Sequence, residues 1–442
     1  MRNGYPALVI QHPPRTRLRA SSRAIDEVGN LLAYLRTEGV AWLRRGDGMV
    51  GVGEVARFSG TFTEAEAWWQ EFCAQLDGGA LQLECGPVGP VAFASFVFDP
   101  ATTAQQSVLV VPRVLIGRRK GCSWLTEISD GLAPDATAEP VEPDNPRPVE
   151  HAETAAAHTA SQSVRKVAES LDREQWQDIV EQAVGRIGQG EIDKVVLARG
   201  VTLEADEPLD GRTLVRELAD RYPSCWTYYV DGLVGASPEM LIRREDGLAT
   251  SRVLAGTIRR NGAEELDLKL AHALARSGKN LIEHELAVES VARALAPFCS
   301  GMNVPDAPYV LELPNVLHLA SDVTAVAHPD VSALRLAGEL HPSAAVCGTP
   351  TEVARKVIAE LEHLDRGRYS GPVGWLDANG DGEFAIALRC GLLDPSDPRR
   401  ITIYAGCGIV SESDPAEEYA ETEAKLLPML EALGVPTPVH HD

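Results

Sequence analysis

IDKVVLARG, at residues 192–200, sets β-branched and aliphatic residues between polar ends and predicts a β-strand. Because side chains alternate between the two faces of a strand, Lys194 shares a face with Val196 and Ala198, and the opposite face is apolar as well. Neither face therefore suits full exposure to solvent. Two interpretations of Lys194 follow: a cation directed into a functional site, or a lysine at a sheet edge whose ammonium group reaches water.

The residues around this strand predict a mixed architecture. REQWQDIVEQAVGRIGQG, at 173–190, spaces its apolar residues as one face of a helix and ends in glycines, so a helix leads directly into the strand. Further along, strand-like and helical segments do not alternate as a βαβα series, which favours an α+β fold with antiparallel sheet. The strand-like segments lie at 224–237, 383–393 and 401–410, and the helical ones at 279–298 and 417–430.

Composition divides the chain into three parts. Residues 1–129 alternate short apolar runs with glycine-rich turns and predict a strand-rich region. Residues 130–163 are rich in Pro, Ala and acids without apolar periodicity, which predicts a surface loop. Residues 164–435 carry the mixed elements. A chain of 442 residues could hold two or three domains or one large unit.

The charge of the chain excludes some classes of partner. Its 64 Asp and Glu outnumber 41 Lys and Arg, and a net charge of -23 would repel nucleic-acid phosphate and anionic lipid. We expect no nucleic-acid and no membrane partner, whereas an anionic small molecule would need cations gathered in one pocket. The eight cysteines form no CxxC pair, and no signal-peptide core or 18-residue apolar run occurs. A cytoplasmic protein with reduced thiols is expected.

One carboxylate stands at a strand end in a defined direction. In GASPE, residues 235–239, the proline fixes the backbone just before Glu239, as a positioned proton donor requires. The alternative is a solvated glutamate in a turn.

Two predicted helices carry further carboxylates on one face. Glu283 shares its face with the short polar Asn280, and Glu418, Glu421 and Lys425 project from one side of the last helix. Mg²⁺ is often held by one or two carboxylates together with substrate oxygens, so two facing helices could bind it. Solvated acidic faces are the alternative.

A glycine-bearing segment and an arginine could recognise an anion. AGCGIV, at 405–410, is predicted as a turn after a strand whose backbone N–H groups can approach an anion at Gly406. It lacks the spacing of dinucleotide and nucleoside triphosphate sites. Arg389, predicted within a strand, suits a bidentate grip on a carboxylate, and a buried ion pair is the alternative.

Ten motifs in one order resemble the chorismate-utilising enzymes, which include isochorismate synthases, salicylate synthases, anthranilate synthase component I and aminodeoxychorismate synthase component I. The resemblance spans roughly residues 175–430, and the part before 130 matches only loosely. The motifs are KVVLAR (194–199), GASPE (235–239), LAGT (254–257), IEHE (282–285), LHLAS (317–321), HPSAAVCGTP (341–350), LDRGRYSGPVGW (364–375), ALRCG (387–391), AGCGIV (405–410) and EYAETEAKL (418–426).

The resemblance implies roles for the two candidate acid–base residues. Lys194 matches the general base that activates water to attack C2 of chorismate, and Glu239 matches the general acid that helps the C4 hydroxyl leave. A lysine with an ordinary pKa of about 10.4 is a poor base at neutral pH, so such a site must lower that pKa. Glu239 needs the reverse shift in order to keep its proton.

The resemblance also implies a Mg²⁺ site and a set of substrate-binding residues. Glu283 and Glu421 match the family's metal ligands, with Glu418 and Asn280 acting through water, although Asn280 departs from the acidic residue common at that position. The ion would neutralise the ring carboxylate of chorismate. The residues that match substrate-lining positions are Gly256, Thr257, His318, Ala345, Val346, Arg389, Gly406 and Lys425.

Departures within the motifs favour one branch of the family. Ala255 stands where aminodeoxychorismate synthases carry a lysine, and CGTPT at 347–351 stands where ammonia-using and several salicylate-forming members read S-G-x-P-K. His341 likewise replaces their phenylalanine. HPSAAVCGTP therefore resembles the isochorismate synthases of menaquinone and siderophore biosynthesis. A salicylate synthase and a non-catalytic chorismate-binding protein on the same fold remain as rivals.

The resemblance predicts the fold and the partners. We expect one large α+β unit of two antiparallel sheets packed face to face, with helices outside and residues 164–435 as the chorismate-binding catalytic region. No glutaminase-like segment occurs in the chain. A monomer without a glutaminase subunit is expected.

Overall fold

The computed structural model describes residues 18–77, 86–87, 89–130, 163–260, 262–312 and 316–435. The surface loop predicted at 130–163 lies, apart from its two end residues, outside this part of the chain.

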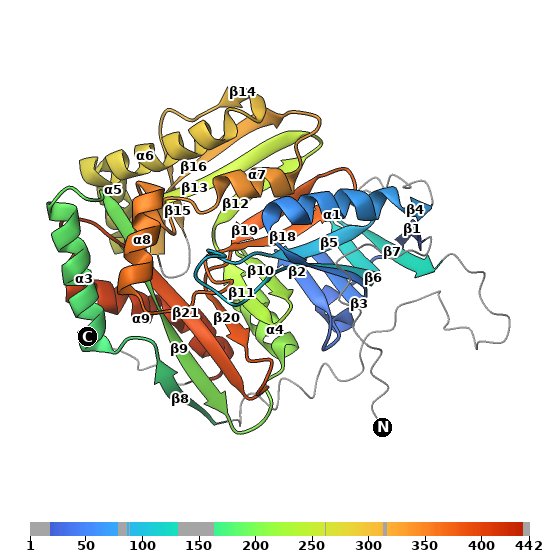
Figure 1. Ribbon diagram of the computed structural model, residues 1–442, viewed down its shortest axis with the longest axis horizontal. Helices are drawn as coiled ribbons and strands as arrows, with labels where there is room; N and C mark the ends of the chain where they lie inside the picture. The colour runs from blue at the N-terminus through green and yellow to red at the C-terminus, as the bar shows by residue number, and fades with distance from the viewer. Residues whose placement is uncertain are drawn as a thin grey trace.

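The described strands form one 21-stranded sheet with two long wings joined through β3 and β6 (Figure 1). One wing runs from β3 to the strand that begins with Lys194. In spatial order its strands are β3 (Asp47–Gly60), β2 (Val40–Arg44), β10 (Trp226–Val230), β11 (Leu233–Ser237), β20 (Cys390–Leu393), β21 (Arg400–Ile409) and β9 (Lys194–Ala205), with β8 (Val164–Glu169) and β17 (Gly348–Thr349) both paired to β9.

The second wing starts from the first half of β6. In spatial order its strands are β6 (Ser107–Arg119), β5 (Val91–Ser95), β18 (Pro372–Asp377), β19 (Gly382–Ile386), β12 (Met240–Glu245), β13 (Leu248–Arg259) and β16 (Val316–Ala327), with β14 (Cys299–Asn303) and β15 (Tyr309–Glu312) both paired to β16. The strands β1 (Leu18–Ile25), β4 (Leu76–Asp77) and β7 (Cys122–Asp130) extend the junction. Among the described pairings only β1–β4 is parallel.

The wings face each other across an aromatic core. Trp42 and Tyr228 from one wing and Phe93 and Ala385 from the other belong to a single buried cluster. The expected arrangement of two antiparallel sheets packed face to face, with helices outside, is confirmed. Each wing corresponds to one of the two expected sheets, and the strand pairing is continuous from one wing into the other. Strands from before residue 130 pair with strands from after 163, as β2 does with β10 and β5 with β18.

Helices cover the outer faces of both wings (Figure 1). The first wing is covered by α3 (Arg173–Gly188), α4 (Gly211–Arg221), α8 (Thr351–Leu361) and α9 (Pro415–Ala432). The second wing is covered by α1 (Phe62–Ala74), α5 (Glu264–Arg276), α6 (Gly278–Leu295) and α7 (Ala333–Leu340), and a 3₁₀ helix, η1 (Leu31–Tyr34), packs on β3 and β6.

The predicted helix before β9 begins where its sequence supplies a cap. The Asp172 side chain accepts from the Gln175 N–H, and the Gln175 side chain accepts from the Asp172 N–H, which forms a capping box. Trp176, Ile179 and Val180 then lie buried on one face, as their spacing predicts.

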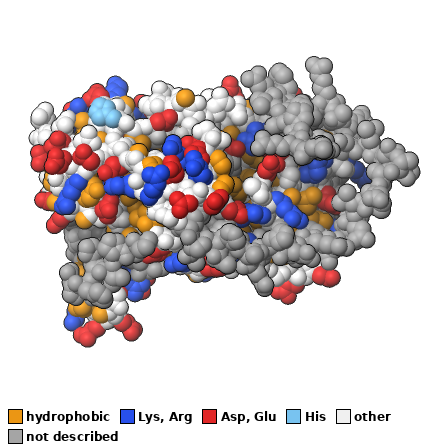
Figure 2. Space-filling view, turned by 90° about the horizontal axis from the view of Figure 1, so that it is seen from below, with side chains coloured by type: hydrophobic (Ala, Val, Ile, Leu, Met, Phe, Trp, Pro, Cys, Tyr) orange, Lys and Arg blue, Asp and Glu red, His pale blue; other side chains and the backbone are white. Residues whose placement is uncertain are grey.

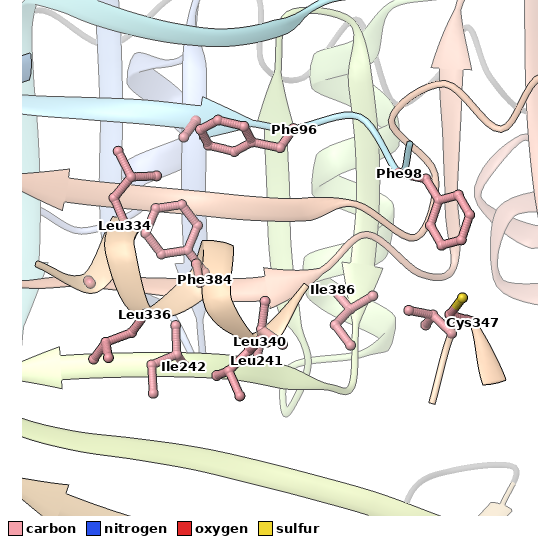
Figure 3. Close-up of a cluster of buried hydrophobic side chains, with 14 of the residues drawn as sticks. Phe96, Phe98, Leu241, Ile242, Leu334, Leu336, Leu340, Cys347, Phe384 and Ile386 are labelled. Atoms are coloured by element: carbon pink, nitrogen blue, oxygen red, sulfur yellow. The ribbon is translucent and has the colours of Figure 1, made fainter. Parts of the chain in front are cut away.

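The apolar side of α7 packs against the second wing beside the predicted substrate segment. Figure 3 shows Leu336 and Leu340 of α7 near Leu241 and Ile242 of β12, with Ile386 and Cys347 beyond them. This core therefore reaches from α7 to the HPSAAVCGTP segment.

Two segments differ from their predicted structure. AGCGIV follows the strand-like prediction for 401–410 and not the prediction of a turn: β21 continues through Ile409, because its backbone pairs with β9 as far as Val195. EFAIALRCGLL is not one strand: it breaks after Ile386, and Arg389 adopts a positive φ of 49° between β19 and β20. The two halves pair with different wings, so the chain has to turn between them.

Surface and thiol chemistry add three observations. In the face shown in Figure 2, acidic and basic side chains are interspersed. No helix of the described residues is both long and apolar enough to cross a bilayer. Cys122 is disulfide-bonded, which corrects the prediction of reduced thiols throughout, because chain spacing does not reveal which cysteines meet in space. The free thiols among the described residues are Cys73, Cys225, Cys299, Cys347, Cys390 and Cys407.

Candidate active site

Lys194 begins β9 between two neighbouring strands, β21 and β17. Its side chain runs across Gly408 of β21, where an added Cβ would lie 2.7 Å from Cε and 3.4 Å from Nζ of Lys194. The absence of a side chain at Gly408 therefore leaves the space that the lysine occupies.

The end of the HPSAAVCGTP segment lies along the start of β9. The Val196 N–H donates to the Cys347 carbonyl at 2.8 Å, and the Asp193 N–H donates to the Thr349 carbonyl at 2.9 Å. Gly348 has a φ of 135°, and a Cβ there would lie 2.2 Å from the Lys194 carbonyl oxygen. Only glycine allows this approach, which brings the segment that carries Ala345 and Val346 next to Lys194.

Glu239 is buried at the junction of β11 and β12, with 9% of its surface exposed. Its N–H donates to Ser237 Oγ at 3.2 Å, and its carbonyl accepts from the Ile386 N–H at 3.1 Å. Burial raises the pKa of its carboxyl group to about 7, against the opposing effect of Lys194, Arg389 and Lys425. The positive charges of these three residues therefore act on this carboxyl group.

Arg389 is fixed beside the same strand by its backbone. Its carbonyl accepts from the Ala236 N–H at 3.2 Å, and the next residue, Cys390, pairs with Gly235. The turn between β19 and β20, rather than a position in a strand, directs this guanidinium group.

A β-bulge shapes the LAGT motif. The register of β13 against β16 shifts between Ala255 and Thr257, and the intervening Gly256 has a φ of 79°. A Cβ at Gly256 would lie 3.2 Å from Cβ of Asn280, so α6 packs closely on the bulge. Thr257 pairs with His318 across the two strands, and the side chain of Thr257 is not among those that the structure describes.

His318 is buried and held neutral. Burial lowers the pKa of its imidazole to about 3, with further lowering by Arg389 and Lys425 and an opposing effect of Glu421. It therefore acts near neutral pH as an uncharged hydrogen-bonding group.

The last helix brings Lys425 and Glu421 to the same cluster. Lys425 Nζ donates to the Gly406 carbonyl at 2.8 Å and lies 2.5 Å from Glu421 Oε1. Burial acts to raise the pKa of Glu421, but Lys425, Arg389 and His318 outweigh it and the pKa is lowered. Glu421 is consequently a charged carboxylate that interacts with Lys425, Arg389 and His318.

Glu418 is the second carboxylate of α9. Burial raises its pKa, and Glu421 raises it further, whereas hydrogen bonds from Ser413 and Cys407 lower it. The two carboxyl groups therefore lie close enough to repel, and a divalent cation would relieve that repulsion. Oxygen donors of this kind fit Mg²⁺.

The predicted metal ligand on α6 is only partly described. Glu283 lies in α6 three residues after Asn280, whose amide donates to Ser277 Oγ at 2.9 Å, and the side chain of Glu283 lies outside the description. Among the described side chains no three metal-binding groups converge on one point.

Sequence reasoning missed a buried ion pair that connects two parts of the site. Glu362 accepts from the Ala198 N–H at 2.7 Å, while Arg366 donates to the Val196 carbonyl at 2.7 Å and to the Val346 carbonyl at 2.9 Å. The pair thus joins β9 to the HPSAAVCGTP segment. The sequence signal for this pair was the i, i+4 spacing of Glu362 and Arg366, the first arginine of LDRGRYSGPVGW.

His284 is a second residue that was missed. Its Nδ1–H donates to the Ala255 carbonyl at 3.2 Å, and its Nε2 shares a hydrogen bond with Ser321 Oγ at 2.8 Å. It therefore joins α6 to β13 and β16 beside the bulge. Its position in IEHE, next to a candidate ligand, was the only sequence signal.

The cluster suits acid–base chemistry on a small anionic molecule. Glu239 holds a proton up to near-neutral pH, Lys194 is a candidate base whose charge acts on Glu239, and Arg389 and Lys425 supply further positive charge. In a chain with a net charge of -23, three cations act at this site, which suits an anionic substrate.

Comparison with known proteins gives a consistent result. A family model described as "Chorismate binding enzyme" matches residues 32–434. The isochorismate synthase MenF of Bacillus subtilis is 34% identical over 371 residues, which cover 80% of this chain and 76% of that protein. The isochorismate synthase DhbC of the same organism is 37% identical over 298 residues, or 65% of this chain and 73% of that protein.

A solved structure supports the same relationship. The menaquinone-specific isochorismate synthase MenF of Escherichia coli superimposes with a TM-score of 0.76 at 25% identity, over 96% of each chain.

Proposed function

Because the chain belongs to the chorismate-binding enzymes, we propose that it is an isochorismate synthase, an isomerase that converts chorismate to isochorismate. In the proposed reaction water attacks C2 of chorismate, the double bonds shift and the C4 hydroxyl leaves. No glutaminase subunit takes part, because the attacking molecule is water rather than ammonia.

The observation that carries the proposal is the pairing of Lys194 with a buried, proton-holding Glu239. Burial keeps the carboxyl of Glu239 protonated up to a pH of about 7, so it can donate to the departing oxygen. Lys194 acts on the opposite side of the ring and takes a proton from the attacking water. The charge of Lys194 opposes the rise in the pKa of Glu239, which supports the action of both groups on one substrate.

The remaining predicted residues bind and orient the substrate in this proposal. Arg389 and Lys425 attract the carboxylates of the substrate. The carbonyl of Gly406 in β21 accepts a hydrogen bond from Lys425 and keeps its side chain in place. Neutral His318 donates or accepts a hydrogen bond without adding charge. The backbone of Gly256, Thr257, Ala345 and Val346 forms the walls.

We further propose that Glu283 and Glu421 hold Mg²⁺, with Glu418 beside them. When bound, the ion would neutralise the ring carboxylate and keep it in place. The lowered pKa of Glu421 supports this role, because a ligand has to be charged at neutral pH. We propose a cytoplasmic enzyme that works as a monomer.

The test is a product assay with purified protein, chorismate and Mg²⁺, with and without a chelator. Isochorismate that is lost with chelator is expected, whereas salicylate with pyruvate would assign the chain to the salicylate synthases. Unchanged chorismate would favour a binding protein. Lys194→Ala should then slow turnover by about 10² to 10⁴, because it removes a general base. Near wild-type turnover in that variant would contradict the assignment of Lys194 as the general base.

A further inference from the structure

A cavity of about 240 Å³ lies behind Glu239, on the side of α6, α7 and α8. Of the predicted site residues, Glu239 and Ala345 are among its described lining, while Lys194, Arg389 and Lys425 are not. The three cations nevertheless act on the Glu239 carboxyl group. Glu239 therefore lines this cavity while its carboxyl group also responds to the three cations.

The cavity has apolar and polar walls. Leu241, Leu340 and Ile386, which Figure 3 shows side by side, form part of the apolar wall. The polar wall includes Ser343 and Arg355, and Ser343 Oγ and Arg355 Nε are buried with no hydrogen-bond partner in the described part of the chain. Buried polar atoms of this kind are ordinarily satisfied by water.

The cavity can hold that water. A water molecule takes about 30 Å³ in the liquid, so the volume is ample for several molecules in contact with the two polar atoms. Exposed Ser290 of α6 also lines the cavity, so it reaches the surface along this helix.

The proposed reaction needs such a space on the side of Glu239. A C2–O bond forms as Lys194 takes a proton from the attacking water, and the C4–O bond breaks as that oxygen takes the proton of Glu239. One water molecule is consumed at the face of the base, and one is released at the face of the acid. Lys194 ends protonated and Glu239 ends ionised, so a proton has to return to Glu239 before the next turnover.

We propose that the cavity behind Glu239 is the route by which the released water exchanges with solvent, and that its ordered water returns the proton to Glu239. The inference rests on the proposed function. It assigns to Ser343 and Arg355 the task of holding water in the cavity. Neither residue belongs to the predicted substrate-binding set, and both act through the water they hold, so both are positioning residues.

The test follows oxygen exchange at C4 during the reaction in H₂¹⁸O. Chorismate has one hydroxyl group, at C4. At initial rates, before released isochorismate accumulates and rebinds, label enters it when the enzyme-bound product reverts with a solvent water in place of the one released. The measured quantity is the ratio of ¹⁸O-labelled chorismate to isochorismate formed, by mass spectrometry. A fold defect lowers both rates together and leaves this ratio unchanged.

The variants fill the cavity away from the reacting groups. Ala294→Phe adds bulk from α6, and Ser290→Leu does so at an exposed position that tolerates a larger side chain. Ala292→Phe, the same change on the same helix but outside the described cavity lining, is the matched control.

A several-fold fall of the ratio in either filling variant, with the control at the wild-type ratio, is expected. An unchanged ratio in both filling variants, or an equal fall in the control, would overturn the role of the cavity while isochorismate formation upholds the proposed function. A wild-type protein that forms no isochorismate would overturn the proposed function itself.

Discussion

Replacement of Gly408 by alanine should displace the lysine of the site without removing it. The added Cβ would lie 2.7 Å from Cε of Lys194, whereas carbon atoms in contact lie about 3.5–4.0 Å apart, so the side chain has to move by about 1 Å. A misplacement of about 1 Å can cost about 10²-fold in rate. The φ of Gly408 lies outside the left-handed region, so alanine strains no backbone. We expect kcat to fall about 10²-fold while the folded state persists.

The assay is isochorismate formation at saturating chorismate, together with thermal unfolding. Gly200→Ala on β9 is the matched control, because its Cβ would meet only side-chain atoms at 3.3 Å and beyond. The double variant Lys194→Ala/Gly408→Ala should be no slower than Lys194→Ala alone, since both changes act through one ammonium group. Wild-type kcat in Gly408→Ala, or a further 10²-fold loss in the double variant, would refute this reasoning.

Three further predictions concern proton donation, metal binding and stability. The pKa of Glu239 is raised to about 7 and its acid form is the proton donor, so kcat/KM should fall as pH rises through about 7. In a pH–rate profile, Glu239→Gln should no longer show this fall and should be slower by about 10² to 10⁴. Glu421→Gln should raise the Mg²⁺ concentration for half-maximal rate by at least about tenfold, and exposed Glu417→Gln, on the same helix, should leave it unchanged in a Mg²⁺ titration. Arg366→Met should lower the free energy of unfolding by about 3–5 kcal/mol, because it leaves buried Glu362 unpaired, and denaturant unfolding of Arg366→Met/Glu362→Gln should recover part of the loss.

The candidate residues could be found in the sequence because their types stand in ordered motifs. The fold class followed from the order of elements, and the helix before β9 followed from its cap and apolar spacing. The predictions that were wrong concern segments in which pairing with a distant strand determines the backbone conformation. AGCGIV became strand because β9 lies beside it, and Arg389 left the strand because its flanks join different wings.

The sequence by itself determined the chemistry that is available: an acid after a rigid proline, a lysine in an apolar strand, and carboxylates on helical faces. Only the tertiary structure decided the state of those groups. Burial raises the pKa of Glu239 and lowers that of His318, and glycines at 348 and 408 leave room beside Lys194. The cavity behind Glu239 also has no signature along the chain, since α6, α7, α8 and the second wing form it together. Desolvation and close approach depend on which distant segments meet, and local sequence does not carry that information.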